Sequence, residues 1–217
     1  MSDYKQKVNT IIALIRKDDG DRKRKLCKGI AKYLAIQSMY RDNVIDETFL
    51  DLFYSFYGLG RQKPNIDRTG LQNLLQTGRN RKTKGIPNPT QYERHLDTVI
   101  NTISLNRTKQ FSYSTKVLHT IWNDLPIYDS QVADFTGFKA RTAATCHSIR
   151  DLYDNRDGNS FFRLIEEYDK LVSSSTCRKN IRFKKRTFTS EQASDISPVK
   201  KIDFMIWGFW EKKKKAK

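Results

Sequence analysis

Asp129 is the residue whose type and surroundings point most clearly to chemistry. It follows the segment LPIY at residues 125–128 and precedes Val132, Ala133 and Phe135, which recur at helical spacing. An aspartate at that position caps a helix, because its side chain can accept hydrogen bonds from the N–H groups of the first turn. A helix cap needs no further role, so the residues around Asp129 must decide whether it also takes part in a reaction.

The histidines and cysteines of the chain do not form a pattern that would hold a metal ion or a disulfide framework. The three histidines have no ligand spacing, and the three cysteines lie far apart without a C-x-x-C pair. We therefore expect reduced thiols, and neither a metal nor another cofactor. These residues are His95, His119 and His147, and Cys27, Cys146 and Cys177.

The charge of the chain restricts its partners more than its fold. Lysine and arginine number 41 against 24 aspartates and glutamates, which gives a formal net charge of +17. An excess of this size usually faces a polyanion, of which nucleic acid is the commonest, although a solvated basic surface is the alternative. No segment is apolar enough to span a membrane, and the charged start MSDYKQKVNT does not resemble a signal peptide. We expect a cytoplasmic monomer in the bacterial cytosol or nucleoid.

The elements that must position Asp129 are helices. Apolar residues recur at three- and four-residue steps through most of the chain, and the sustained alternation of a large sheet is rare. The fold class is therefore all-α, with a short hairpin near residues 181–189. Asp46 and Gly58 are expected at the two ends of one helix. Helices are predicted at residues 4–16, 24–39, 46–58, 71–75, 90–104, 113–122, 129–136, 139–154, 159–172 and 200–211.

The stretch around Asp129 resembles a known family. Residues 126–132 read PIYDSQV, which matches the pattern P-[IV]-x-D-x-x-V that precedes a helix in the helix-hairpin-helix superfamily of DNA glycosylases. This superfamily includes adenine-mismatch, thymine-glycol and 8-oxoguanine glycosylases, and the chain resembles a divergent member. The block KIDFMIW at residues 201–207 also resembles a C-terminal helix of some divergent members.

The resemblance implies roles for individual residues. The matching aspartate is catalytic in the family, so this role falls on Asp129, and the lysine that attacks the sugar in bifunctional members matches Lys116. The family hairpin holds a DNA phosphate on glycine amides, but residues 108–114 contain no glycine. The phosphate contacts are then expected from Lys109, Ser112 and Ser114.

The chemistry of base excision agrees with this interpretation. Breaking an N-glycosidic bond builds oxocarbenium-like charge on the sugar, which a buried carboxylate stabilises, and the carboxylate can also orient or deprotonate a water. A lysine with a lowered pKa could attack instead and leave a Schiff base. The nucleotide must first leave the base stack and enter a pocket. We expect Tyr113, Tyr128, Trp122 and His119 to line this pocket, although core packing is the alternative for Trp122.

The resemblance also implies that residues 1–217 form one catalytic unit with two helical lobes. Residues 51–129 form the hairpin-bearing lobe, and residues 1–50 together with 130–217 form the second lobe.

Two further segments are basic. Residues 173–201 are interpreted as a basic linker, and residues 212–217 as a charged tail. A loop-rich region around residues 60–90 is expected to add contacts with DNA phosphates. Its basic cluster consists of Arg79, Arg81, Lys82 and Lys84.

Three functions stay open at this point. The first is a DNA glycosylase that flips a damaged or modified base out of double-stranded DNA and leaves an abasic site. Its substrate could be an oxidised or alkylated base in repair, or a hypermodified cytosine of phage DNA in defence. The second is a non-catalytic DNA- or RNA-binding protein, and the third is a basic interaction protein in which Asp129 only caps a helix. Strand cleavage after excision depends on Lys116 and is left open.

Overall fold

The computed structural model describes residues 2–18, 20–58, 66–81, 87–104, 110–154, 160–184 and 186–210. Within these ranges the regular structure is helical apart from one two-stranded sheet, which confirms the all-α class. None of the helices found there is both long and apolar enough to cross a membrane. In chain order the elements are α1 (Ser2–Lys17), α2 (Asp21–Arg41), α3 (Glu47–Phe56), α4 (Arg68–Arg81), α5 (Pro89–Ile103), α6 (Phe111–Ile121), α7 (Ser130–Thr136), α8 (Ala143–Asp154), α9 (Ser160–Ser173), α10 (Ser175–Arg178), β1 (Arg182–Phe183), β2 (Arg186–Thr187), α11 (Ser190–Ser194) and α12 (Pro198–Phe209).

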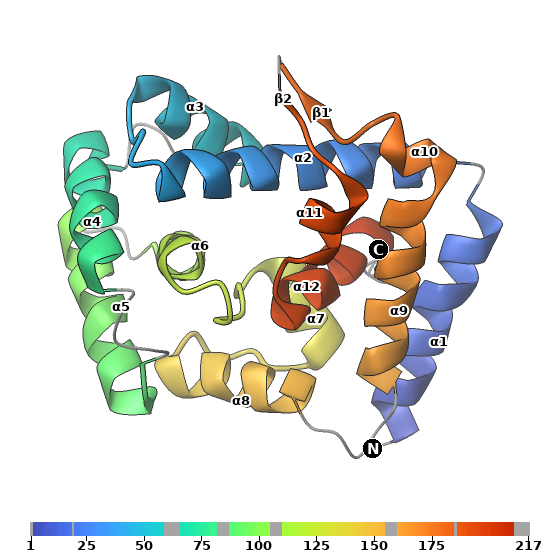
Figure 1. The fold of residues 1–217 in the computed structure, drawn as a ribbon. Coiled ribbons are helices and arrows are strands. Elements are labelled where there is room, and N and C mark those ends of the chain that lie inside the picture. Colours follow the sequence, from blue (N-terminus) through green and yellow to red (C-terminus); the bar gives the residue numbers. More distant parts are fainter. Residues whose placement is uncertain are drawn as a thin grey trace, which may run out of the picture.

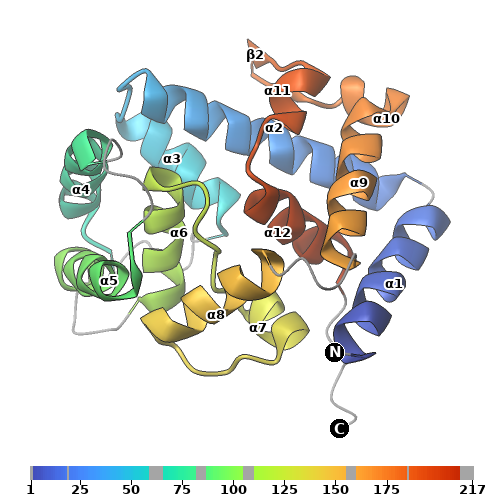
Figure 2. The same cartoon turned by 60° about the horizontal axis from the view of Figure 1, so that its bottom comes forward.

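The helices form a frame around α6 and α12, which lie in the middle of the molecule (Figures 1 and 2). Helices α4 and α5 pack beside α6, while α1 and α9 pack beside α12. The long helix α2 crosses from one side to the other and contacts α3 and α4 as well as α10, α11 and α12. One continuous cluster of buried apolar side chains runs through both sides. The two halves of the frame therefore share a core.

Local caps explain where several helices begin. The side chain of Asp46 accepts a hydrogen bond from the backbone N–H of Phe49 at 2.9 Å, which confirms its predicted place at the start of α3. Gly58 follows the other end of α3 with a positive φ of 66°, which glycine adopts without steric cost. Ser197 caps α12, and Pro198 in its first turn needs no N–H partner. Short-range signals thus set the ends of helices that meet at the core.

The segment that the sequence indicated as a basic linker, residues 173–201, is folded, and this corrects that interpretation. It contains α10, α11 and an antiparallel hairpin that pairs Arg182 with Thr187, so the hairpin expected near residues 181–189 is present. The Tyr168 hydroxyl donates a hydrogen bond to the Ala193 carbonyl at 2.9 Å and holds α11 against α9. The many polar residues of this segment suggested a linker, although its few apolar side chains reach the core.

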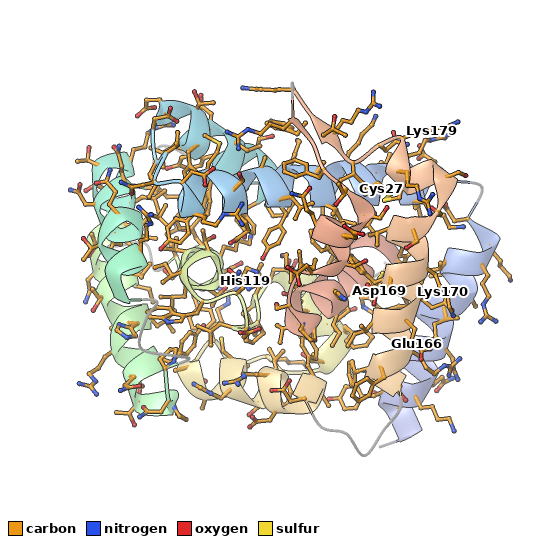
Figure 3. The ribbon with its side chains drawn as sticks, in the orientation of Figure 1. Cys27, His119, Glu166, Asp169, Lys170 and Lys179 are labelled. Carbon is orange, nitrogen blue, oxygen red and sulfur yellow. A yellow bond between two sulfur atoms is a disulfide. The ribbon has the colours of Figure 1, made fainter. Side chains whose placement is uncertain are left out.

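A disulfide joins Cys27 on α2 to Cys177 on α10, whereas reduced thiols had been expected (Figure 3). The two residues lie 150 positions apart in the sequence, but their Cα atoms are 5.3 Å apart. Spacing in the sequence could not reveal this pair, because only the packing of α10 against α2 brings the sulfurs together. Cys146 is a buried free thiol.

Candidate active site

Asp129 and Lys116 line the same cavity, which has a volume of about 230 Å³. Its walls come from the C-terminal end of α3, from α6, from the start of α7 and from α12. The fold therefore brings together the two residues to which the family resemblance gave catalytic roles. Two further ionisable side chains, Lys200 and Asp203 of α12, also line this Asp129 cavity.

Asp129 is the N-cap of α7, as its sequence context predicted. Its Oδ1 atom accepts hydrogen bonds from the backbone N–H groups of Gln131 at 2.8 Å and Val132 at 2.9 Å. Both bonds use the same oxygen, and Oδ2 accepts no hydrogen bond from the described residues. Capping and chemistry are therefore compatible, because one oxygen fixes the carboxylate while the other stays available to a ligand.

The segment before Asp129 is clamped between two helices. The backbone N–H of Tyr128 donates to Thr115 Oγ1 on α6 at 3.1 Å, and the N–H of Ile127 donates to Asp203 Oδ2 on α12 at 3.3 Å. These bonds satisfy buried backbone groups outside regular structure. They also fix the position of Asp129 relative to α6 and α12, which carry the two lysines of the cavity.

Lys116 is a partly buried lysine on α6. Its Nζ atom donates a long hydrogen bond of 3.5 Å to the Tyr57 carbonyl and lies 5.7 Å from the centre of the Tyr57 ring. Burial lowers the pKa of Lys116, and the nearby negative charge of Asp129 opposes this shift.

Lys200, in the first turn of α12, is one of the cavity residues that the sequence-based prediction missed. It is 4% exposed, and four aromatic rings lie within 6 Å of its Nζ atom, at 4.8–5.8 Å. Those rings belong to Tyr33, Phe56, Tyr57 and Phe204. Burial lowers the pKa of Lys200 to about 8, against the attraction of Asp203 and Asp129. A lysine with such a pKa is partly neutral near physiological pH, and a neutral amine is a nucleophile.

Asp203 lies one helical turn after Lys200 and is also 4% exposed. Besides the Ile127 N–H, it accepts a hydrogen bond from the Tyr153 hydroxyl at 3.4 Å. Burial raises the pKa of Asp203 to about 7, while the charge of Lys200 opposes the rise. Asp203 can therefore exchange a proton near neutral pH, which is the property a general acid or base needs.

The two lysines and two aspartates of this cavity form no direct ion pair within the described part of the chain. The neighbouring Lys201 differs, because its Nζ atom pairs with Asp169 on α9 at 2.9 Å (Figure 3). Burial without direct pairing keeps the charged forms of Lys200 and Asp203 unfavourable, so their pKa values converge toward neutrality. The Asp129 cavity thus gathers a fixed carboxylate, a proton-exchanging carboxylate and two amines of lowered pKa.

A wall of the Asp129 cavity is aromatic. Phe204 and Trp207 of α12 line it, and Trp207 is 44% exposed. The Trp207 ring rests on Gly29 of α2, where an added Cβ atom would lie 3.1 Å from the ring. A large, partly exposed ring at the mouth of a small cavity can stack on a planar ligand.

The aromatic residues and the histidine predicted for a base pocket do not line the Asp129 cavity. His119 is fully buried, and its Nδ1 and Nε2 atoms hydrogen bond to the Leu125 carbonyl at 2.5 Å and the Tyr33 hydroxyl at 3.2 Å (Figure 3). Burial lowers the pKa of His119 to about 3, so the ring is neutral at physiological pH.

The other three predicted pocket residues serve packing. Tyr113 packs against Phe53 and Tyr54 in the core. Tyr128 donates its hydroxyl hydrogen bonds to the loop after α7. Trp122 stacks on His95 and lines a different, smaller cavity of about 190 Å³. Core packing, the alternative considered for Trp122, therefore explains all three.

The structure describes the side chains of three residues that were predicted to hold phosphates, which are Ser112, Ser114 and Arg79. Ser114 is fully buried and donates its hydroxyl to the Gln110 carbonyl at 3.0 Å, so it does not present that group to DNA. Ser112 is partly buried at the start of α6. Arg79 is exposed near the end of α4 and lines a second cavity. Lys109, Lys82, Lys84 and the side chain of Arg81 lie outside the described residues, as does the tail at 212–217.

A signal for Lys200 and Asp203 exists in the sequence. Together with Lys201, the two residues interrupt a stretch in which Val199, Ile202 and Phe204 are buried. Charged residues on a buried face are rare unless they are paired or functional. Comparison with known proteins gives no family: no family model, no curated protein and no solved structure matches this chain.

Proposed function

We propose that this protein is a DNA N-glycosylase, which flips a damaged or modified base out of double-stranded DNA, excises it and leaves an abasic site. The observation that supports the proposal best is the shared cavity of Asp129, Lys116, Lys200 and Asp203. The net charge of +17 supports a polyanionic partner, because lysine and arginine release counterions from DNA on binding.

Asp129 is proposed to stabilise the positive charge that develops on the sugar. A fixed negative oxygen near the reacting carbon lowers the energy of an oxocarbenium-like transition state, since it needs no reorganisation during the reaction. The α7 cap already holds Oδ1, so Oδ2 is the oxygen that can act on the sugar or on a water molecule.

Lys200 is proposed as the amine for attack on the sugar, in place of the Lys116 indicated by the family resemblance. The Lys200 nitrogen forms a bond with C1′, and the bond from C1′ to the base breaks with its electron pair leaving on the base. Asp203 can take the proton that the amine loses, because its pKa of about 7 lies near that of Lys200. The bond between C1′ and O4′ then breaks, O4′ takes the proton back from Asp203, and C1′ is left as a Schiff base with Lys200.

A flipped base is proposed to lie against Trp207 and Phe204. The cavity of about 230 Å³ is smaller than the roughly 300–1,000 Å³ of pockets for drug-sized ligands. A single base or sugar is an occupant of suitable size. Both repair substrates and hypermodified cytosines belong in the test.

The experiment is a cleavage assay on labelled duplexes that each carry one candidate base: an oxidised purine, an oxidised pyrimidine, an alkylated purine, a mismatched adenine or a hypermodified cytosine. Alkali converts abasic sites into strand breaks, so excision is read as a shorter strand. We expect at least one duplex to be cut, and Asp129→Asn to abolish this cutting. Asparagine caps helices as well as aspartate does, so α7 is expected to stay intact.

Asp151→Asn, at an exposed aspartate of α8, is the matched control and is expected to cut like the wild type. Cutting by Asp129→Asn at the wild-type rate would remove Asp129 from the reaction. Binding of every duplex without any excision would instead favour a non-catalytic DNA-binding protein.

A further inference from the structure

A second cavity, larger than the Asp129 cavity, lies between α2, the end of α4, the loop after α6 and the region of α11. Its volume is about 550 Å³. The polar side chains that line it include Gln37, Tyr40 and Asn123. We call it the Gln37 cavity. It contains none of the residues proposed for base excision.

Buried polar atoms without partners collect at the Gln37 cavity. Gln37 Nε2, the Tyr40 hydroxyl and Asn123 Oδ1 are buried and make no hydrogen bond with the described residues. Tyr40 is only 2% exposed. An unsatisfied buried polar group costs about 1–3 kcal/mol, so a fold seldom keeps several in one place without a use for them. In the Asp129 cavity, the lining residue Tyr57 likewise has a buried hydroxyl without a hydrogen-bond partner among the described residues.

These three groups include both a hydrogen-bond donor and a hydrogen-bond acceptor. The Gln37 amide nitrogen donates, the Asn123 amide oxygen accepts and the Tyr40 hydroxyl can do either. A ligand that fits them must present both an acceptor and a donor. The edges of nucleobases carry such pairs, and asparagine and glutamine are the side chains that read them in nucleic-acid complexes.

Cations and rings complete the lining. Arg41 and Arg79 are exposed and line the cavity. Burial raises the pKa of the Tyr40 hydroxyl, and the positive charge of Arg79 opposes this rise. Tyr33 and the partly buried Phe188 also line the cavity. Asp195 also lines the cavity, so a phosphate is expected near Arg79, and Asp195 can accept from an amino group or a sugar hydroxyl.

The outer wall of the Gln37 cavity is attached to the rest of the fold. An Arg186 guanidinium nitrogen of β2 donates to Ser38 Oγ of α2 at 3.1 Å. The disulfide between Cys27 and Cys177 ties α10, just before the hairpin, to the other end of α2. The segment that carries Phe188 and Asp195 therefore has fixed contacts with α2 on which a ligand site can depend.

We propose that the Gln37 cavity binds a nucleobase with an adjoining phosphate. Gln37, Tyr40 and Asn123 hydrogen bond to the base, and Arg79 binds the phosphate. Tyr33 lines the Gln37 cavity, and its ring lies 5.1 Å from the Nζ atom of Lys200, which lines the Asp129 cavity. The occupant therefore sits next to the proposed active site, either as a second nucleotide of the DNA or as a free nucleotide. The inference requires a nucleotide but no base excision.

The test measures binding of the four deoxynucleoside 5′-monophosphates to the full chain by titration calorimetry. We expect saturable binding of at least one nucleotide. Gln37→Ala and Asn123→Ala are expected to weaken it at least about tenfold each, the effect of one lost hydrogen bond to a buried group. Asn73→Ala, at an exposed amide on α4, is the matched control and is expected to bind like the wild type.

Arg79 is tested by comparing a nucleotide with its nucleoside. Arg79→Ala is expected to weaken binding of the monophosphate and to leave the nucleoside unchanged, whereas Arg94→Ala, at an exposed arginine of α5, changes neither. A 5′-phosphorylated trinucleotide that displaces the monophosphate identifies DNA as the source. Its failure to displace it identifies a free nucleotide.

Two results would overturn the proposal: no saturable binding of any nucleotide, or binding that Gln37→Ala, Asn123→Ala and Arg79→Ala all leave unchanged. Tyr40→Phe keeps the buried ring and removes the unpartnered hydroxyl, so it reports on the site even if an alanine variant fails to fold. Asp129→Asn must bind the monophosphate like the wild type, which separates this inference from the proposed excision.

Discussion

Tyr33 of the Gln37 cavity contacts Lys200 of the Asp129 cavity, but the two cavities differ in the groups that they bury. The first buries Lys200 and Asp203, whose charged forms are costly without water, so the pKa values of both move toward neutrality. The second buries amide and hydroxyl groups that do not titrate near neutral pH and leaves them without partners. Burial thus shifts the pKa values of the groups in the Asp129 cavity, and it leaves polar groups of the Gln37 cavity without hydrogen-bond partners among the described residues. We therefore assign chemistry to the Asp129 cavity and ligand recognition to the Gln37 cavity.

Lys200→Met gives the largest expected effect, and it acts on the Asp129 cavity alone. In a duplex with an abasic site, the Lys200 amine condenses with the C1′ aldehyde, releases water and forms an imine that borohydride reduces to a stable adduct. We expect the variant to form this adduct about a hundredfold more slowly, the size of effect typical for one catalytic group. Denaturing gel electrophoresis measures the adduct.

Two other lysines control this experiment. Lys170→Met, at an exposed position on α9, is expected to form the adduct normally. Lys116→Met is expected to retain most of it, because Lys116 is the less buried lysine of the cavity. Loss of the adduct in Lys116→Met with retention in Lys200→Met would transfer the nucleophile to Lys116.

The pH dependence of the same reaction is the second prediction. The Lys200 amine reacts when neutral, so adduct formation is expected to rise with pH through the pKa of about 8. The neutral fraction of such an amine grows about tenfold between pH 7 and pH 9. A rate that is flat or falls over this range would contradict the assignment of a buried amine as the nucleophile.

The double variant Gln37→Ala/Asn123→Ala is expected to affect affinity but not chemistry. The Kd for an abasic duplex is expected to rise about tenfold if the Gln37 cavity holds a nucleotide of the DNA. The rate of adduct formation at saturating DNA stays unchanged, because neither side chain lines the Asp129 cavity. A fall in that rate with an unchanged Kd would contradict the assignment of chemistry to the Asp129 cavity and of recognition to the Gln37 cavity.

Tyr40→Phe gives the smallest expected effect, on stability. Removing an unpartnered buried hydroxyl is expected to leave the free energy of unfolding unchanged or to raise it by up to about 1 kcal/mol. Tyr168→Phe is the matched comparison, because its hydroxyl donates to the Ala193 carbonyl, and its loss is expected to cost about 1 kcal/mol. Urea unfolding measures both. Equal losses in the two variants would show that the Tyr40 hydroxyl has a partner.

Local sequence predicted the parts of the site that depend on neighbours in the chain. The helical class, the cap at Asp46 and the cap at Asp129 follow from short-range hydrogen bonds, and the structure has all of them. Lys116 reaches the same cavity because one helix and one short loop connect it to Asp129.

The missed features depend on contacts between distant segments. Asp203 meets the segment before Asp129 across 76 positions, and the two cysteines meet across 150. Neither distance leaves a local pattern. The residues predicted for a base pocket lie outside the Asp129 cavity for a related reason: Tyr113 and His119 lie near Asp129 in the sequence, but their side chains point into the core of the shared frame.

The most direct test of the central claim does not require the excised base to be known. Duplexes are prepared with either a cationic pyrrolidine analogue of the sugar, which mimics the charged transition state, or a neutral tetrahydrofuran analogue. We expect the wild type and Asp151→Asn to bind the cationic duplex at least about tenfold more tightly than the neutral one, as a site complementary to that charge must. Asp129→Asn is expected to lose this preference while it binds the neutral duplex normally. An equal preference in Asp129→Asn and the wild type would contradict the account.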